Sequence, residues 1–203
     1  MDKKKVLLQL EFLRKKSLKM RLAAEEWDSD WKILVSIIMS AQSRDETTII
    51  VANSLFKKYS TLKKLSKANY FDVLKVFKSL NYNKTKAKNV INCAKILLKD
   101  YDCKVPMDFN KLINLPGVGR KTANVFLSEK GKDTIGVDTH LSYVSQYLNW
   151  SKHKNPVVIE RDLKNLFPKN YWRLVNPVVV RFGKSYTNRK EKNKILDCIK
   201  KIK

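Results

Sequence analysis

Cysteine, glycine and proline are all scarce in this chain. Its 203 residues include three cysteines, five glycines and five prolines. Cys93, Cys103 and Cys198 are odd in number and widely spaced, so we expect neither a disulfide framework nor a metal site, and a reducing, intracellular compartment. The shortage of glycine and proline leaves few strong breaks between regular elements.

Acidic residues are also few. There are 19 Asp and Glu residues against 43 Lys and Arg residues, which gives a net charge of +24. Such an excess predicts strong attraction to a polyanion. Nucleic acid is the first candidate and an anionic membrane surface the second. The plain alternative is a lysine-rich proteome in which every protein surface is basic.

Long hydrophobic runs are absent too. No segment approaches the roughly 18–20 apolar residues of a membrane helix. The first residues, 1–16, carry a basic head and a short apolar run broken by Gln9 and Glu11, so we expect no signal peptide. Hydrophobic residues make up 43% of the chain, which is enough for a core in one large domain or two small ones.

Apolar residues recur mostly at helical spacing, which predicts an all-α fold. Thr61, Asn69 and either Asp138 or Thr139 are candidate N-caps, as are Asp30 and Asp45. The stretch VNPVVVRF could form a strand on β-propensity alone. Helices are expected over 5–16, 17–27, 31–41, 46–59, 62–68, 70–80, 86–101, 109–115, 120–131, 140–150, 156–167, 171–186 and 191–203.

The stretch LPGVG, residues 115–119, lies between two expected helices. Glycine permits left-handed backbone angles and close approach of another backbone. We expect the amides of Gly117, Val118 and Gly119 to point outward without partners, as an anion site at the positive end of the next helix. Together with the basic charge, this favours contact with a DNA backbone. An ordinary helical hairpin with a glycine cap is the alternative.

Two cations follow this turn. Lys121 would lie in the first helical turn beside Arg120, and both features disfavour its ammonium form. A neutral lysine is a nucleophile that can form a Schiff base. The alternative is a charged lysine in contact with phosphate. Asp138, between an apolar run and a helix, is expected to be an N-cap, and a capping carboxylate that faces a cleft can also serve catalysis.

These residues stand in motifs that resemble the endonuclease III family of helix–hairpin–helix DNA glycosylases. The spacing from Lys121 to Asp138 fits that family, and the resemblance covers roughly residues 30–187. The matching stretches are LPGVGRKTANVFL with VDTH, SAQSRD (residues 40–45), LNYNKTKAKNVINCAKILL (residues 80–98) and VPMDFNKLINLPGVG (residues 105–119).

The resemblance implies a bifunctional DNA glycosylase and apurinic/apyrimidinic lyase of base excision repair. The damaged base would leave the duplex for a pocket between two helical domains. Lys121 would attack C1′ of the deoxyribose, and Asp138 would help to deprotonate it. The resulting imine permits β-elimination, which cuts the strand on the 3′ side. Oxidised pyrimidines are the expected lesions.

The resemblance also implies which residues bind DNA. Gln42, Tyr82 and His140 would fill the gap left by the flipped nucleotide. Tyr82 stands where the family often has an aliphatic residue, beside Asn81, where glycine is usual. The other expected DNA contacts are Gly117, Val118, Gly119, Arg120 and Lys84.

Two positions depart from related families. Adenine glycosylases of similar fold carry a catalytic glutamate where this chain has Ser36, which argues against an adenine glycosylase. Endonuclease III proteins carry four cysteines near the C-terminus that hold a [4Fe–4S] cluster, where this chain has only Cys198. We expect no cluster and no other cofactor, with a basic helix packing Ile195, Leu196 and Ile199 on the core instead. Backbone carbonyls of the hairpin can hold a monovalent cation in this superfamily.

The expected fold is an all-α, two-domain helix–hairpin–helix glycosylase with a cleft between the domains and no iron–sulfur cluster loop. Residues 29–134 would form a barrel-like domain, and residues 1–28 with 135–203 the second domain. We expect a monomer in the cytoplasm, associated with the nucleoid, that binds damaged or abasic double-stranded DNA and no membrane. The alternatives are a glycosylase for mismatched thymine or uracil or for oxidised guanine, and a non-catalytic helix–hairpin–helix DNA-binding protein.

Overall fold

The computed structural model describes residues 2–202, which contain helices and no strand. The all-α prediction is therefore confirmed. The chain forms two compact units, one of residues 21–129 and one of residues 1–20 with 130–203. The domain limits expected from the sequence lie a few residues further along the chain and stay a prediction.

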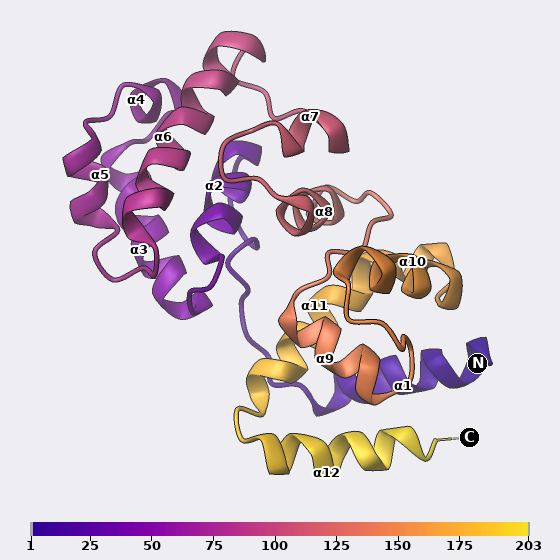
Figure 1. The fold of residues 1–203 in the computed structure, drawn as a ribbon. Coiled ribbons are helices and arrows are strands. Elements are labelled where there is room, and N and C mark those ends of the chain that lie inside the picture. Colours follow the sequence, from indigo (N-terminus) through magenta and orange to yellow (C-terminus); the bar gives the residue numbers. More distant parts are fainter. Residues whose placement is uncertain (1, 203) are drawn as a thin grey trace. The chain divides into compact units, whose positions relative to one another are not determined.

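The unit of residues 21–129 is built around a buried helix, α2 (Figure 1). Residues 33–39 of α2 are all buried, because α2 packs against α3, α6 and α8. A helix that is covered on all sides is apolar all round, which explains the run ILVSIIM. The helices of this unit are α2 (Asp30–Ser40), α3 (Asp45–Lys58), α4 (Leu62–Ser66), α5 (Tyr70–Val76), α6 (Asn83–Asp100), α7 (Phe109–Ile113) and α8 (Arg120–Glu129).

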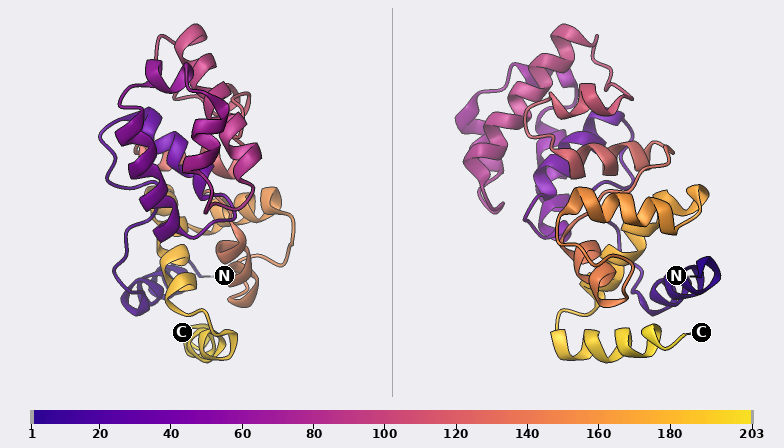
Figure 2. Two further views of the ribbon diagram at one scale, coloured as in Figure 1. Left: turned by 90° about the vertical axis from the view of Figure 1, so that its left-hand side faces the viewer. Right: turned by 45° about the vertical axis from the view of Figure 1, so that its right-hand side comes forward.

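The second unit is organised by α11, which packs against α1 and α9. Val175, Val179 and Phe182 are buried along one face of α11, so the stretch with strand propensity is helical, with Pro177 inside the helix. The two ends of the chain, α1 and α12, lie side by side (Figure 2). The helices of this unit are α1 (Lys3–Lys16), α9 (Thr139–Tyr147), α10 (Pro156–Leu166), the 3-10 helix η1 (Lys169–Tyr171), α11 (Trp172–Ser185) and α12 (Arg189–Lys200).

The segment before α2, residues 21–29, is an irregular connector, so the helix predicted over 17–27 is wrong. Side chains satisfy its backbone in place of a helical ladder. The Arg21 guanidinium donates to the Glu25 carbonyl at 2.7 and 3.0 Å, and the Trp27 indole donates to the Ala23 carbonyl at 2.7 Å. Arg21 also stacks over the Trp27 ring at 4.5 Å.

Several predicted helix caps are confirmed. Thr61, Asn69 and Asp138 each accept a hydrogen bond from a backbone N–H of the helix that follows. Asp30 and Asp45 are instead the first residues of their helices, so their prediction as N-caps is wrong. A carboxylate in the first helical turn is still favourable, because it faces the positive end of the helix dipole.

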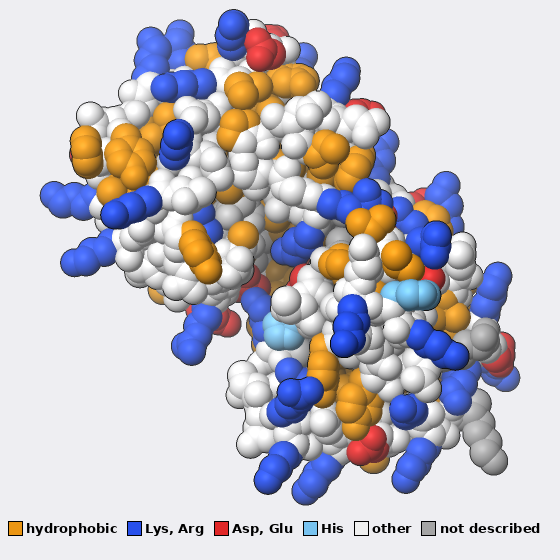
Figure 3. Space-filling view, viewed as in Figure 1, with side chains coloured by type: hydrophobic (Ala, Val, Ile, Leu, Met, Phe, Trp, Pro, Cys, Tyr) orange, Lys and Arg blue, Asp and Glu red, His pale blue; other side chains and the backbone are white. Residues whose placement is uncertain are grey.

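Positive charge is spread over both units. Lys and Arg side chains are scattered over the visible face of each unit, and acidic side chains are few (Figure 3). Within residues 2–202, no helix is both long enough and apolar enough to cross a membrane.

Candidate active site

A tight turn, residues 114–119, joins α7 to α8. Gly117 has a φ of +81°, and a Cβ atom there would lie 3.0 Å from the Asn89 Cβ and 3.0 Å from the Ile38 Cγ2. The left-handed conformation and the close packing on α6 and α2 both require glycine. The fold itself therefore explains Gly117.

Gly119 is different, because nothing lies within 4 Å of the position a Cβ would take. Within residues 2–202, no backbone carbonyl accepts from the N–H of Gly117 or Gly119, whereas the Val118 N–H donates to the Leu115 carbonyl at 3.0 Å. The expectation that the Val118 amide lacks a partner is wrong, since this bond closes the turn. The bare side of the turn thus offers two backbone donors to an anion.

The two cations after the turn differ in their surroundings. The exposed Arg120 places its guanidinium over the Phe109 ring, 5.0 Å from the centroid, so the hairpin's two helices meet there. Lys121, the second residue of α8, is half-buried, and the next two residues are buried. Lys121 therefore lies where the helix passes from the bare turn into the core.

Asp138 begins α9 in the other unit. It follows the buried residues 135–137 and its Oδ1 accepts from the Leu141 N–H at 2.8 Å. The Asn176 side-chain amide donates to the Gly136 carbonyl at 2.5 Å and holds the approach to the helix. One oxygen of the Asp138 carboxylate, Oδ1, therefore caps α9.

His140 lies in the first turn of α9 and packs on Gly183 of α11. A Cβ atom at Gly183 would lie 2.3 Å from His140 Nδ1 and 2.7 Å from Cγ. The absence of a side chain at Gly183 therefore makes room for the imidazole. Gly183 lies in the stretch RFGKSYT, residues 181–187. Only the packing of α9 on α11 shows why a glycine is needed there.

Replacing Gly183 with alanine should destabilise the protein by about 1–3 kcal/mol, because the new methyl group overlaps the imidazole. In a His140→Ala background the ring is gone, and the same change should be close to neutral, since alanine favours a helix interior. Urea unfolding of the four proteins measures this coupling. Equal destabilisation in both backgrounds would show that Gly183 does not shape the His140 site.

Gln42 and Tyr82 lie on two loops of the 21–129 unit that the fold joins. The Asn81 side-chain amide donates to the Gln42 carbonyl at 2.6 Å, and the Asn81 N–H donates to Ser43 Oγ at 3.2 Å. Both candidate side chains are exposed, Tyr82 by 65%. Two residues expected to enter the DNA stack therefore project from one connected structure.

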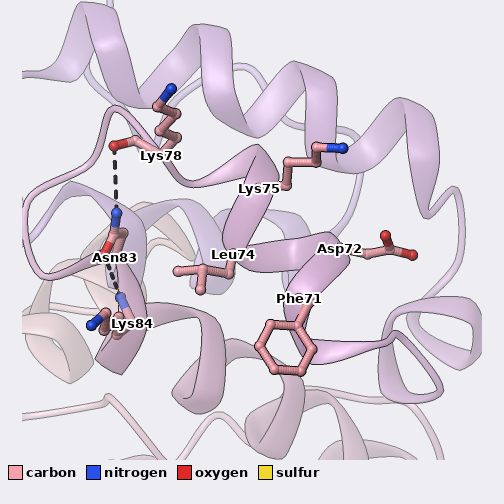
Figure 4. A pocket seen from close by; sticks show the side chains of 7 residues that line it. All are labelled: Phe71, Asp72, Leu74, Lys75, Lys78, Asn83 and Lys84. Atoms are coloured by element: carbon pink, nitrogen blue, oxygen red, sulfur yellow. Dashed lines mark hydrogen bonds between the residues drawn. The ribbon is translucent and has the colours of Figure 1, made fainter.

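Lys84 borders a shallow groove of about 490 Å³ between α5 and the start of α6 (Figure 4). Lys75 and Lys78 also line it, beside Leu74 and Phe71, whose ring is 74% exposed. Cations next to an exposed aromatic ring suit a nucleic-acid strand.

The C-terminal helix α12 packs one face on the core of its unit. Leu196 and Ile199 are buried and Ile195 is partly buried against the same core, so the predicted packing is confirmed. The Tyr143 hydroxyl donates to Asn193 Oδ1, and the Tyr147 hydroxyl donates to an α12 carboxylate at 2.7 Å.

The cysteines do not fit an iron–sulfur cluster. The buried Cys93 belongs to α6 and burial raises the pKa of its thiol to about 12, which disfavours the thiolate that binds metal. Cys103 belongs to the same unit as Cys93, and Cys198 lies on α12 in the other. Within residues 2–202, no three His, Cys, Asp or Glu side chains gather to hold a metal ion.

The fold and the hairpin define a class of protein. Residues 35–169 match the model of the HhH-GPD superfamily base excision DNA repair proteins. The chain is 36% identical over 155 residues to endonuclease III of Thermotoga maritima, covering 76% of this chain and 73% of the relative. It is 40% identical over 138 residues to endonuclease III of Rickettsia conorii, covering 68% and 66%.

The structure agrees with these sequence matches. A trapped endonuclease III–DNA covalent intermediate superposes with a TM-score of 0.84 at 27% identity, covering 94% of this chain and 90% of that one. The chain belongs to the endonuclease III family of DNA glycosylases and AP lyases in base excision repair.

Proposed function

We propose that Lys121 is the nucleophile of a bifunctional glycosylase and lyase that removes oxidised pyrimidines from DNA. The observation that carries the proposal is the place of Lys121. It is half-buried in the first turn of α8, directly after a turn whose outer side is bare backbone. A phosphate held by the Gly117 and Gly119 amides would bring the deoxyribose of the same strand close to this lysine.

Asp138 is the proposed partner of Lys121 in this chemistry. Its Oδ2 accepts the lysine proton, which frees the amine to bond to C1′ as the bond from C1′ to the base breaks. The sugar ring then opens at the bond from C1′ to O4′, which gives the imine and leaves a proton on O4′. The imine loses a proton from C2′ as the bond from C3′ to the phosphate oxygen breaks, and water then hydrolyses the imine and frees Lys121. The products are the free base and a strand cut on the 3′ side.

The partner that this function requires is duplex DNA with a damaged base or an abasic site. The net charge of +24 supports it, because lysine–phosphate contacts release counterions on binding. Gln42, Tyr82 and His140 would fill the gap, and Arg120, Lys84 and the turn amides would hold the strand. We propose that the protein acts as a monomer, in the same compartment as the DNA that it repairs.

Borohydride reduction of the imine tests the reaction. We expect a covalent adduct on a duplex with one oxidised pyrimidine and on a duplex with an abasic site. An adduct on the abasic duplex alone would keep the lyase and reopen the choice of base. A lesion panel with mismatched thymine, uracil and oxidised guanine then separates the sister glycosylases. Tight binding without any adduct would favour a non-catalytic DNA-binding protein.

We also propose that the protein works without an iron–sulfur cluster, and that α12 does the structural work of the cluster loop. Four thiolates are needed, and the sequence has three cysteines, one of them buried in another helix. Purified protein should contain no stoichiometric iron or acid-labile sulfide, and one cluster per chain would contradict this. A monovalent cation at the hairpin carbonyls stays a prediction.

A further inference from the structure

Gln42 and Tyr82 share an unfavourable backbone conformation. Their φ angles are +54° and +56°, in the left-handed region. A non-glycine residue is strained there, and it persists only where its surroundings hold it. The two residues lie on separate loops, one after α2 and one before α6, so something must hold both loops.

Ser43 is the point at which the two loops meet. Its hydroxyl oxygen accepts from the Asn81 N–H at 3.2 Å and from the Lys86 ammonium at 2.9 Å. This one serine, next to Gln42, therefore bonds to a residue before Tyr82 and to a residue after it in the chain.

Lys86 is an unusual residue for this position. Only 5% of its surface is exposed, and it lies near the positive end of α6, which disfavours a cation. Its hydrogen-bond partner is a neutral hydroxyl, and burial lowers the pKa of its ammonium to about 8. An apolar side chain of the same length would fill the space without burying a charge, so packing alone does not call for lysine.

We propose that Lys86 is a positioning residue for base extrusion. Its buried ammonium, through the Ser43 hydroxyl, holds the Gln42 loop at a set distance from the Tyr82 loop, so that both side chains enter the DNA stack together. This inference rests on the proposed function, because it assigns a role to the two gap-filling residues. Lys86 itself touches neither the DNA nor the reacting atoms.

The effect should be larger on extrusion than on cleavage. A base that is paired and stacked must be driven out of the duplex, whereas an abasic site has no base to extrude. A misplacement of about 1 Å in a positioning group can cost up to about 100-fold in rate. Loss of Lys86 should therefore slow excision much more than it slows cutting at an abasic site made beforehand.

The test compares Lys86→Met, Lys86→Arg and Ser43→Ala with the wild type in single-turnover assays on a lesion duplex and on an abasic duplex. Lys88→Met is the matched control, since it removes the same charge from an exposed position on the same helix. We expect Lys86→Met and Ser43→Ala to slow excision about 10- to 100-fold and abasic cutting less than about threefold. Lys86→Arg should restore part of the rate, and Lys88→Met should stay close to wild type.

A double-mutant comparison separates positioning from general destabilisation. In a Gln42→Ala, Tyr82→Ala background, Lys86→Met should cause little further loss of excision, because residues that act through one another are not additive. An equal loss in both backgrounds, an equal slowing of excision and abasic cutting, or a Lys88→Met variant as slow as Lys86→Met would each overturn the inference.

The proposed function can fail separately. If the wild type neither excises the lesion nor cuts the abasic duplex, the glycosylase proposal falls and the role of Lys86 falls with it. If the wild type is active and Lys86→Met matches it on both duplexes, only the inference about Lys86 fails.

Discussion

Replacing Lys121 with alanine should reduce strand cleavage at an abasic site by about 1,000-fold or more, the size of loss seen when a nucleophile is removed. The borohydride-trapped adduct should vanish with it. Lys121 is the second residue of α8 and half-buried. Alanine is the best helix former, so the variant should fold. Quantified gel assays under single-turnover conditions measure the loss.

The control for this prediction is Lys111→Ala, which removes an exposed cation from α7 of the same hairpin. That variant should keep the adduct. DNA affinity of Lys121→Ala should fall only a few-fold, because Lys121 is one positive charge among the many that attract the DNA. An adduct that persists in Lys121→Ala would mean that another amine is the nucleophile.

Changing Asp138 to asparagine should slow excision by about 100- to 10,000-fold, the usual contribution of a positioned proton acceptor, while stability stays nearly unchanged. Asparagine caps a helix as well as aspartate does, so the hydrogen bond from Asp138 Oδ1 to the Leu141 N–H has a replacement. The amide cannot accept the lysine proton. Excision rates and urea unfolding on the same protein measure both effects.

Two further substitutions at this position separate its roles. Asp138→Ala should lose both the rate and about 1 kcal/mol of stability, since the cap is gone. Asp138→Ser should keep the cap and still be slow. A wild-type rate in Asp138→Asn would reduce Asp138 to a helix cap.

The hairpin was predictable because its signals are local. LPGVGRKT combines a helix stop, a left-handed glycine and a basic first turn within eight residues. The structure divides the glycines, however. Gly117 is required by its φ of +81° and by contacts with α2 and α6, while Gly119 has open space around it. The sequence does not separate these reasons, because the neighbours of Gly117 are distant in the chain.

The residues that hold the proposed gap-filling side chains in place could not be predicted from the sequence. Lys86 reads as one more surface lysine among many, yet it is buried against Ser43. Gly183 reads as a weak point within a helix, yet it makes room for His140. Both roles arise from contacts over more than 40 residues of sequence, which no periodicity records.

The connector before α2 is a segment where the sequence predicted a helix and the structure has an irregular loop. Residues 21–27 have a composition compatible with helix, but Arg21 and Trp27 bond to nearby carbonyls and close an irregular loop. Side-chain hydrogen bonds of this kind compete with the helical ladder, and their geometry is decided by packing.

The sequence by itself determined the helical class, several helix caps, the hairpin and the family, since each depends on residue types at short spacing. It also placed Ile195, Leu196 and Ile199 on the core-facing side of the C-terminal helix. Only the tertiary structure decided which amides of the turn remain available, which lysine is buried and which glycine admits an imidazole. Those features depend on which segments, distant in the sequence, pack against one another. A side chain becomes buried, or a glycine comes close to an imidazole, only after the chain has folded.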